Sequence, residues 1–557
     1  MKKIFALTFI TLFLIHYLTA GKNNNDAPSV AWGDKFKLPA KSYELGFIGN
    51  ATEGYIDVSH MKGRSVNLQK FDPQLKLSFT TRASTKAFGK KYTIEEVVAI
   101  NNKYYLHYST FNKENLRSTL FAQEISLRDG KYAGEPIELL SSTFKVQTQH
   151  KQVSSMSTIV TGKWKTDISS DSSKLLIHYR YKTREQRDAG NRDMVGLYVY
   201  DKAYHKIWGK EIQMPYNAKL MEIEDYRVDG SGKAYILSKV YKSETAKDNG
   251  SAGHYELLIY DKNATTPEIA SLKFDDKYVV SITMHEDRTG RMICAGYYSK
   301  SGRGTDGAFL FAYDKNSKMI NKIGKGFYEF SPDLINQFES KKAIEKSEAK
   351  KEKGQKQSVS HLELKNLVVA DDGSITLFAE QYTYYFIINI SQGGYGGGSL
   401  IYHHFFDDIY VTRINADGEL KWTTKIPKAQ QGITKASFYY SWTHPDASRL
   451  GLSFHVHTLG NDNYLYFTDN KNNLELKSDQ APSVHMAGLG GTLISVKIAS
   501  DGTTKKAPLF DFREKQMNVI TQDMSDVTGK LLLGRAKYGN LKHNGTKGKP
   551  FLITLPY

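Results

Sequence analysis

Residues 408–427 read DIYVTRINADGELKWTTKIP, and this stretch decides the fold class. Apolar and polar residues alternate on both sides of an Asn-x-Asp-Gly turn. The alternating apolar positions are Ile409, Val411 and Ile414 before the turn and Leu420, Trp422 and Ile426 after it. Period-two alternation around an Asp-Gly turn predicts a β-hairpin, because successive side chains of a strand point to opposite faces.

Looser copies of this pattern recur along the chain. A polar turn followed by an alternating run returns at 50–58, 101–108, 170–181, 229–241, 287–298, 371–382, 461–469 and 526–538. Most copies are preceded by a short apolar strand and followed by another strand that ends in a polar turn. Each repeat is therefore expected to be a meander of four short strands.

Four-stranded units of this kind, repeated radially, predict an all-β protein with the β-propeller fold. We expect eight blades. The last unit, 517–557, shows three strands, and 30–38 at the other end of the chain is expected to supply the fourth and close the ring, which leaves no free sheet edge. A ring of seven blades with one irregular unit is the second choice, and two smaller propellers or a pair of sandwiches the third. Trp422 is expected to pack between blades.

The first twenty residues have the layout of a signal peptide. Lys2 and Lys3 precede an apolar run of twelve residues, 4–15, which is too short to span a bilayer, and cleavage is expected near Ala20. Residues 21–557 are then a single propeller domain. No later stretch approaches eighteen apolar residues, so we expect no transmembrane anchor after cleavage. The predicted location is the periplasm, the outer-membrane surface or the extracellular space.

Charge and cysteine content narrow the function classes. The formal net charge is +17, which suits contact with an envelope protein or an acidic glycan. Nucleic acid is excluded as a partner, because the leader directs the chain out of the cytoplasm and no nucleic-acid motif is present. The single cysteine, Cys294, cannot form an intramolecular disulfide and is expected to be a small buried strand residue.

Two insertions interrupt the repeat. Residues 333–357 are rich in Lys and Glu and predict a solvated helix or a disordered loop. Residues 382–406, YTYYFIINISQGGYGGGSLIYHHFF, predict a protruding strand pair or a Tyr- and Gly-rich loop between the second and third strands of their blade.

Few residues point to chemistry. His455 and His457 are two apart, so both rings lie on one face of a strand, and they are the candidate ligands of a divalent metal. No other cofactor is predicted. The candidate ligand- or partner-binding residues are Tyr402, His403, His404 and Asp407, beside the second insertion. Neither a zinc-protease helix nor a nucleophile elbow is present, which weighs against an enzyme.

The segment 382–427 also carries a family resemblance. Its Tyr-rich strand, Gly-rich loop, Tyr402-His403-His404 and INADGELKWTTKIPKAQ, with LYFTDNKNNLEL at 465–476, resemble secreted, uncharacterised proteins of Bacteroidetes-type bacteria. The likeness covers roughly 382–512 and departs at His403-His404-Phe405, where the group is expected to have Tyr-His-Tyr. It implies a secreted propeller-like protein with no assigned activity.

These observations predict an exported, non-catalytic binding or scaffold protein of the cell envelope. The alternative is a propeller enzyme acting on a glycan or glycoconjugate, which a central funnel lined by inward carboxylates and aromatic side chains would favour. A metal-dependent protein using His455 and His457 is the third hypothesis.

Overall fold

Strands dominate the structure, as the alternating patterns predict. The computed structural model describes residues 30–555 except 38–41, 62–64, 90, 147–148, 155–156, 182–191, 249–252, 353, 355–356, 391–397, 438–446, 488–489, 516, 522–523, 528–531 and 539–549. The predicted signal peptide, 1–20, lies outside the described residues.

The first four sheets each contain four antiparallel strands in chain order. Sheet 1 contains β2 (Ser42–Asn50), β3 (Gly54–Met61), β4 (Ser65–Phe71) and β5 (Leu77–Ser84). Sheet 2 contains β6 (Tyr92–Ile100), β7 (Lys103–Phe111), β8 (Ser118–Ser126) and β9 (Lys131–Ser141). Sheet 3 contains β12 (Trp164–Ile168), β13 (Lys174–Tyr181), β14 (Arg192–Asp201) and β15 (Lys206–Asn217). Sheet 4 contains β16 (Met221–Val228), β17 (Ala234–Val240), β18 (His254–Tyr260) and β19 (Glu268–Leu272).

The remaining sheets vary this plan. Sheet 5 contains β20 (Tyr278–Glu286), β21 (Met292–Ser299), β22 (Gly307–Asp314) and β23 (Met319–Glu329). Sheet 6 contains β24 (Leu362–Val369), β25 (Ile375–Ile390), β26 (Gly398–Ile414) and β27 (Leu420–Ile426), to which β28 (Gln430–Ser437) and β31 (His485–Met486) are added. Sheet 7 contains β29 (His455–Leu459), β30 (Asp462–Asp469), β32 (Thr492–Ile498) and β33 (Thr504–Asp511). Sheet 8 contains β34 (Met517–Val519), β35 (Ser525–Asp526), β36 (Leu532–Tyr538), β37 (Pro550–Leu555) and the N-terminal β1 (Ala31–Lys35).

Short elements connect or flank the sheets. They are the hairpin of β10 (Gln149–Ser154) and β11 (Ser157–Gly162), the helices α1 (Glu244–Asp248), α2 (Pro332–Asn336), α3 (Lys341–Glu352) and α4 (Phe512–Lys515), and the 3-10 turns η1 (Lys86–Phe88), η2 (Ala447–Leu450) and η3 (Lys471–Asn473).

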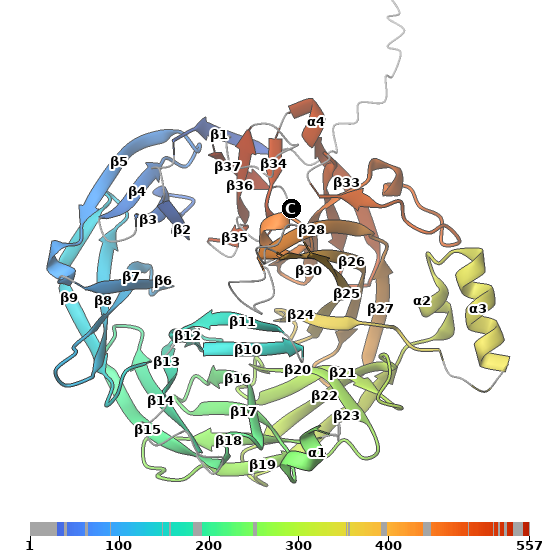
Figure 1. Ribbon diagram of the computed structural model, residues 1–557, viewed down its shortest axis with the longest axis horizontal. Coiled ribbons are helices and arrows are strands. Elements are labelled where there is room, and N and C mark those ends of the chain that lie inside the picture. Colours follow the sequence, from blue (N-terminus) through green and yellow to red (C-terminus); the bar gives the residue numbers. More distant parts are fainter. Residues whose placement is uncertain are drawn as a thin grey trace, which may run out of the picture.

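The sheets follow one another around a centre, with the first strand of each sheet towards the middle (Figure 1). This arrangement confirms the prediction of an all-β, propeller-like protein built from four-stranded antiparallel units. Strands from the two ends of the chain pair with each other, since Ala31 of β1 lies opposite Thr554 of β37. Phe36 and Leu552 then share a buried cluster with Tyr55 and Phe71 of sheet 1.

The hydrophobic core is divided into layers between neighbouring sheets. Trp422 of sheet 6 packs against the cluster between sheets 6 and 7, and its Nε1 donates to the carbonyl oxygen of Ser500 at 3.1 Å. The predicted position of this residue between blades is thereby confirmed. Cys294 is a fully buried residue of β21, as expected, and burial raises the pKa of its thiol to about 12.

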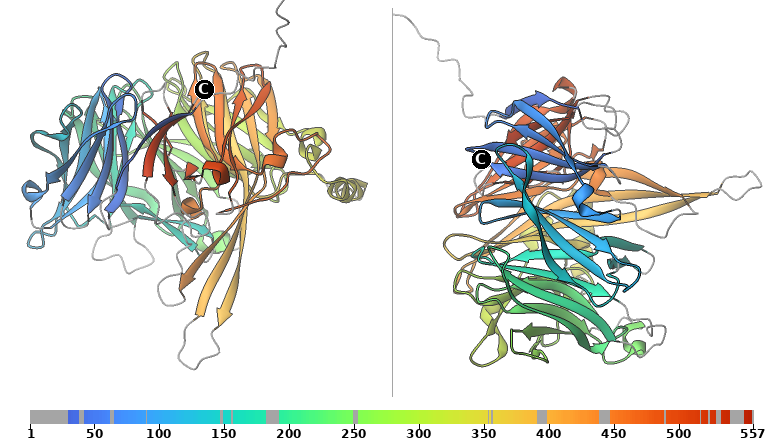
Figure 2. Two further views of the ribbon diagram at one scale, coloured as in Figure 1. Left: turned by 90° about the horizontal axis from the view of Figure 1, so that it is seen from above. Right: turned by 90° about the vertical axis from the view of Figure 1, so that its left-hand side faces the viewer.

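Both insertions have regular structure in their described parts. The charged segment forms α2 and α3 on the outer side of the ring (Figure 1). The Tyr-rich segment is a long antiparallel pair, in which β25 and β26 continue past the ends of β24 and β27 and project from the ring with β28 beside β26 (Figure 2). We call residues 382–390, 398–406 and 430–437 the arm. The added strands β28 and β31 and the hairpin β10–β11 are not anticipated by the sequence patterns.

The turn at Asp417-Gly418 makes a close contact with sheet 5. Gly418 has φ +88°, and a Cβ atom there would lie 2.5 Å from the backbone nitrogen of Gly324. Gly460 also has positive φ, but a Cβ atom at that position would meet nothing within 4 Å. Substitutions at the two glycines can therefore be compared, because one adds a steric clash to the strain of a positive φ and the other adds the strain alone.

We expect Gly418→Ala to lower the free energy of unfolding by about 2–4 kcal/mol, because it adds a backbone clash to the strain of a positive φ. Gly460→Ala should show the strain alone, about 1 kcal/mol. Urea unfolding followed by circular dichroism measures both. Equal losses in the two variants would show that the contact between sheets 5 and 6 does not contribute.

Candidate functional site

Strand β26 changes its hydrogen-bonding partner in the middle of its length. Its outer part pairs with β28 up to Phe406, and its inner part pairs with β27 from Ile409 onwards. Asp407 and Asp408 lie between the two ladders. The arm therefore begins at a junction where the regular sheet pairing is interrupted and side chains have to satisfy buried polar groups.

A buried ion pair fills this junction. Lys428 Nζ lies 2.7 Å from Glu380 Oε1, and both side chains are fully buried. The same ammonium also donates to the carbonyl oxygen of Phe406 at 3.0 Å and to Gln430 Oε1 at 3.1 Å, so its three donors are used. Glu380 in turn accepts a bond of 2.6 Å from Ser453 Oγ, which ties sheet 6 to the segment before sheet 7.

A second buried lysine attaches the charged insertion to the same junction. Lys425 Nζ lies 3.0 Å from Asp408 Oδ2 and 3.0 Å from Glu339 Oε1. It also donates to the carbonyl oxygen of Gln337, at 2.7 Å, just after α2. Burial acts to lower the pKa of Lys425, but Asp408 and the neighbouring Tyr410 and Glu339 outweigh it and hold that pKa above its ordinary value.

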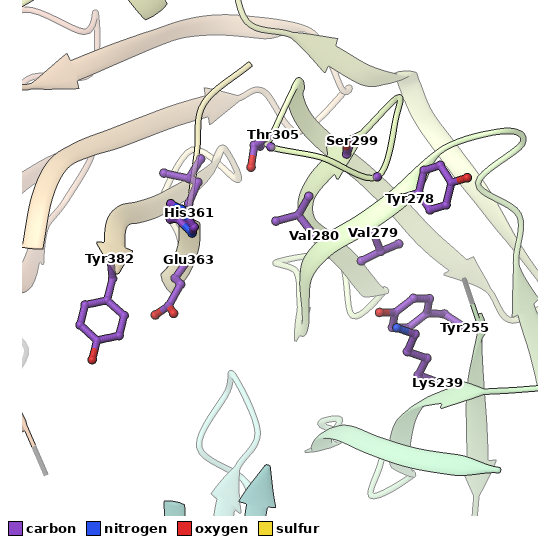
Figure 3. A pocket seen from close by; sticks show the side chains of 14 residues that line it. Lys239, Tyr255, Tyr278, Val279, Val280, Ser299, Thr305, His361, Glu363 and Tyr382 are labelled. Carbon is purple, nitrogen blue, oxygen red and sulfur yellow. The ribbon is translucent and has the colours of Figure 1, made fainter. Parts of the chain in front are cut away.

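A cavity of about 360 Å³ opens beside the junction, between sheets 4, 5 and 6 (Figure 3). Its walls come from the first strands β20 and β24 and from the base of the arm. The lining side chains include Lys239, Tyr255, Tyr278, Val279, Val280, Ser299, Thr305, His361, Glu363 and Tyr382. Three tyrosines and a mixture of charged and hydroxyl groups make it a site for a polar ligand with some apolar surface.

Three features of the cavity wall are unusual for a purely structural gap between sheets. Thr305 Oγ1 is buried in the wall and makes no hydrogen bond within the described part of the chain. His361 has φ +54°, an uncommon conformation for a residue with a side chain, and its carbonyl oxygen accepts from the Tyr382 amide at 2.9 Å. Burial raises the pKa values of Tyr255 and Tyr382 above the usual range, so both hydroxyls remain protonated donors.

A chain of charges connects the cavity to the buried junction. Glu363 has half of its side chain exposed and lies 2.8 Å from Lys365 Nζ. Lys365 Nζ is 3.8 Å from the buried Glu380 and 5.3 Å from the ring centre of Tyr382. Burial would lower the pKa of Lys365, but Glu380 and Glu363 raise it above its ordinary value. Lys365 therefore stays charged, with its ammonium 2.8 Å from the Glu363 carboxyl group.

Carboxylate side chains also lie on the first strands of the sheets, nearer the centre, where they form ion pairs and hydrogen bonds between neighbouring sheets. Arg227 of β16 lies 3.2 Å from Asp167 of β12 and 3.2 Å from Asp225. Asp225 also accepts from Thr283 Oγ1 at 2.8 Å, which joins sheets 4 and 5. Burial raises the pKa of Asp167 to about 6, although Arg227 opposes the shift. The side chains of Asp167 and Asp225 are only 16% and 17% exposed, against 50% for Glu363, so they are less available to a ligand.

The predicted binding residues lie around the arm but do not form one site. His404 is fully buried between Tyr382 Oη, 2.9 Å from its Nδ1, and Thr434 Oγ1, 2.8 Å from its Nε2. Tyr402 is buried on the same face. His403 lies on the opposite face, where its ring stacks on Tyr385 with the centroids 4.7 Å apart. Asp407 is at the junction, and ligand binding by this set stays a prediction.

The predicted metal ligands lie on one strand, β29. His457 is buried with Nδ1 3.2 Å from Asp526 Oδ2. Burial, followed by the nearby His457, lowers the pKa of His455 to about 4, so that ring is neutral. Within the described ranges, no group of three or more metal-ligating side chains gathers here or elsewhere. Metal binding by His455 and His457 remains a prediction.

Sequence patterns miss the residues that shape the site. Lys425 and Lys428 look like outward-facing residues, because in a two-layer blade the positions between apolar ones face solvent. The sequence feature that could have indicated a buried Lys425 was the charged insertion 333–357, because this segment covers that lysine. His361 and Glu363 carry no motif, and only the meeting of three sheets brings them to a cavity.

No protein-family model and no curated protein matches the chain. Among solved structures, it is similar to a prolyl endopeptidase at 10% identity and a TM-score of 0.36, covering 92% of this chain and 55% of that one. Prolyl oligopeptidase B from Galerina marginata gives 8% identity and 0.35, covering 89% and 55%. A thermostable family-43 glycoside hydrolase gives 10% identity and 0.25, covering 54% and 97%. The chain thus spans about half the length of the peptidases it matches.

These comparisons correct one prediction. The expectation of a non-catalytic binding or scaffold protein is contradicted: the solved proteins similar to this chain include peptidases, a glycoside hydrolase and an oxygenase. The likeness is too low to transfer an activity, which has to be argued from the cavity. The resemblance to secreted Bacteroidetes-type proteins stays a prediction.

Replacement of Lys428 by Met should lower the free energy of unfolding by about 3–5 kcal/mol, because Glu380 would remain buried without its charge partner. Lys103→Met is the matched control, since Lys103 makes a 2.9 Å ion pair with Glu124 at the surface and should cost less than about 1 kcal/mol. Urea unfolding measures both variants. Similar losses would contradict a special role for the buried pair.

Asp407 should give the junction a measurable pH dependence. Burial raises its pKa to about 6, so between about pH 4 and 6 the native state keeps a proton that the unfolded state loses, and stability falls as pH rises through this window. Asp407→Asn should therefore stabilise the protein at pH 8 by on the order of 1 kcal/mol, but not at pH 4. The exposed Asp479→Asn serves as control. A gain that is the same at both pH values would contradict the assignment.

Proposed function

We propose that the protein is an enzyme that acts on a glycan or glycoconjugate bound in the cavity between sheets 4, 5 and 6. The observation that carries this proposal is the combination of three tyrosines with the half-exposed Glu363 carboxyl group in one cavity. Tyrosine rings offer flat apolar faces for the C–H side of a sugar ring, while hydroxyl and carboxylate groups bind its hydroxyls.

The proposed chemistry is cleavage of a glycosidic bond by two carboxyl groups. Glu363, which pairs with Lys365 Nζ at 2.8 Å, is the candidate nucleophile or base. Glu224 of β16 is the candidate second carboxyl group, because it acts electrostatically on Tyr255 of the opposite wall, although Glu224 itself is not among the lining residues. Lys239, which also lines the cavity, and the net charge of +17 favour an acidic glycan.

The finer features of the fold belong to the same proposal. We propose a closed ring of eight blades, supported by the pairing of β1 with β37 and by the cluster that joins Leu552 to sheet 1. Export to the periplasm, the outer-membrane surface or the medium is supported by the leader at residues 1–20. An exported enzyme would meet acidic glycans of the envelope.

The proposal is tested with oligosaccharides that carry a fluorophore at the reducing end. A set of neutral, amino-sugar and uronic-acid chains is incubated with the purified protein, and shorter labelled products are separated by electrophoresis. We expect cleavage of an acidic member of the set. Glu363→Gln should slow it at least about 100-fold, because the variant lacks the carboxylate but keeps the shape.

Glu329→Gln is the matched control for this experiment. Glu329 is 56% exposed and pairs with Lys300, much as Glu363 is 50% exposed and pairs with Lys365, but it does not line the cavity. The control should cleave at the wild-type rate. Failure of the wild-type protein to cleave any chain of the set, or equal rates in both variants, would contradict the proposal.

A further inference from the structure

The arm exposes more apolar surface than folding of the described chain explains. Tyr385, Ile387 and Ile388 of β25 each leave about half of their surface exposed, and Ile433 of β28 leaves 42%. Residues 382–390 and 398–406 contain no charged side chain, and 430–437 contain Lys435 alone. Exposed apolar surface of this kind on a projecting element marks an interaction site.

Side chains change in character along the arm. The cross-strand pairs nearest the ring are mostly aromatic: Tyr382 lies opposite Phe406, Tyr384 opposite His404, Tyr385 opposite His403 and Phe386 opposite Tyr402, with Thr383 opposite Phe405 among them. The next pairs outward are aliphatic, with Ile387 opposite Ile401 and Ile388 opposite Leu400, and the last two are Asn389 opposite Ser399 and Ile390 opposite Gly398. Aromatic residues followed by aliphatic ones is the order that a bilayer surface favours, because tyrosine prefers the head-group level and isoleucine the acyl chains.

The exposed residues lie on both faces of the hairpin. Ile387 and Ile388 are consecutive on β25, so their side chains point to opposite sides, and both are half-exposed. A groove on a protein partner, or a second copy of this chain, would cover one side of such a hairpin and leave the other in water. A lipid surface surrounds both sides.

The length of the arm and the positive charge of the protein fit binding to a lipid surface. β24 pairs with β25 only as far as Gln381, so residues 382–390 extend about 30 Å from the ring at a rise of roughly 3.3 Å per residue (Figure 2). Lys435 lies opposite Ile401 and has a stem long enough to place its ammonium among lipid phosphates. The net charge of +17 adds attraction to an anionic surface.

We propose that the arm inserts into the surface of an anionic phospholipid bilayer and holds the protein there. Insertion stops at the interface, because within the described residues β25 has no neighbouring strand on its outer edge beyond Gln381, and backbone groups on that edge need water. The occupant is the lipid surface itself, bound through side chains of both hairpin faces. This proposal does not depend on the proposed enzymatic activity.

Vesicle co-sedimentation tests the proposal. The full chain is mixed with phosphatidylcholine vesicles that either contain or lack phosphatidylglycerol. We expect the protein to pellet with the anionic vesicles and the double variant Ile387→Glu/Ile388→Glu to bind at least about tenfold more weakly. Ile137→Glu/Ile269→Glu is the matched control, because these isoleucines are similarly exposed but lie on outer strands of sheets 2 and 4. It should bind like the wild type.

A fluorescent label reports the position of the arm directly. Cys294 is fully buried and its thiol has a raised pKa, so Ile388→Cys provides the only reactive thiol for an environment-sensitive dye. Emission should shift to the blue on adding anionic vesicles and should stay unchanged with the same dye at Ile137→Cys. Absence of binding to any vesicle, equal losses in both double variants, or a blue shift that needs only higher protein concentration would overturn the proposal, the last by pointing to a second copy of the chain.

Discussion

The buried pair of Lys428 and Glu380 is the interaction on which the unusual parts of this structure depend. Two opposite charges without solvent contact stabilise a protein only if the remaining donors and acceptors are satisfied, and here each has further hydrogen bonds. The pair sits where β26 leaves β27 and takes up β28. Without Lys428 the carbonyl oxygen of Phe406 and the Glu380 carboxyl group would lose a buried partner at the point where the sheet continues outward as an arm.

The same network reaches the two places where function is proposed. Lys365 links Glu380 to Glu363 in the cavity wall and lies over the ring of Tyr382. Tyr382 lines the cavity and is also the first residue of the arm. A lipid-bound arm would therefore hold the cavity at a bilayer surface, where glycoconjugates are displayed. The geometry of one junction thus connects a proposed active site with a proposed attachment site.

Much of the fold could be predicted from local sequence, because strand alternation and turn residues act over a few positions. The hairpin around Gly418, the repeated four-stranded units, the position of Trp422 and the burial of Cys294 all follow from such patterns. The added strand β28 could not be predicted, since it follows Lys428, whose buried partner Glu380 lies 48 residues earlier in the chain. Tyr402, His403 and His404 were identified as one cluster, but strand alternation divides them between two faces.

The cavity was beyond sequence reasoning for a related reason. Tyr255, Thr305 and Glu363 come from three sheets, and their contributions to a ligand site exist only once the sheets are placed around the centre. Carboxylates that look equally suitable in the sequence, such as Asp167 and Asp225, are occupied by Arg227. A site residue differs from a structural one in whether its polar atoms remain open to a ligand, and the residue type alone does not show this.

Hydrogen–deuterium exchange with each class of oligosaccharide tests the central claim, that this cavity receives a sugar chain, without requiring cleavage. The account predicts slower exchange, with an acidic oligosaccharide, in peptides covering 278–280, 299–305 and 361–363, which line the cavity. Peptides of the outer strands β5 and β9 should be unaffected. Unchanged exchange in the cavity peptides with every oligosaccharide, or protection confined to other sheets, would contradict it.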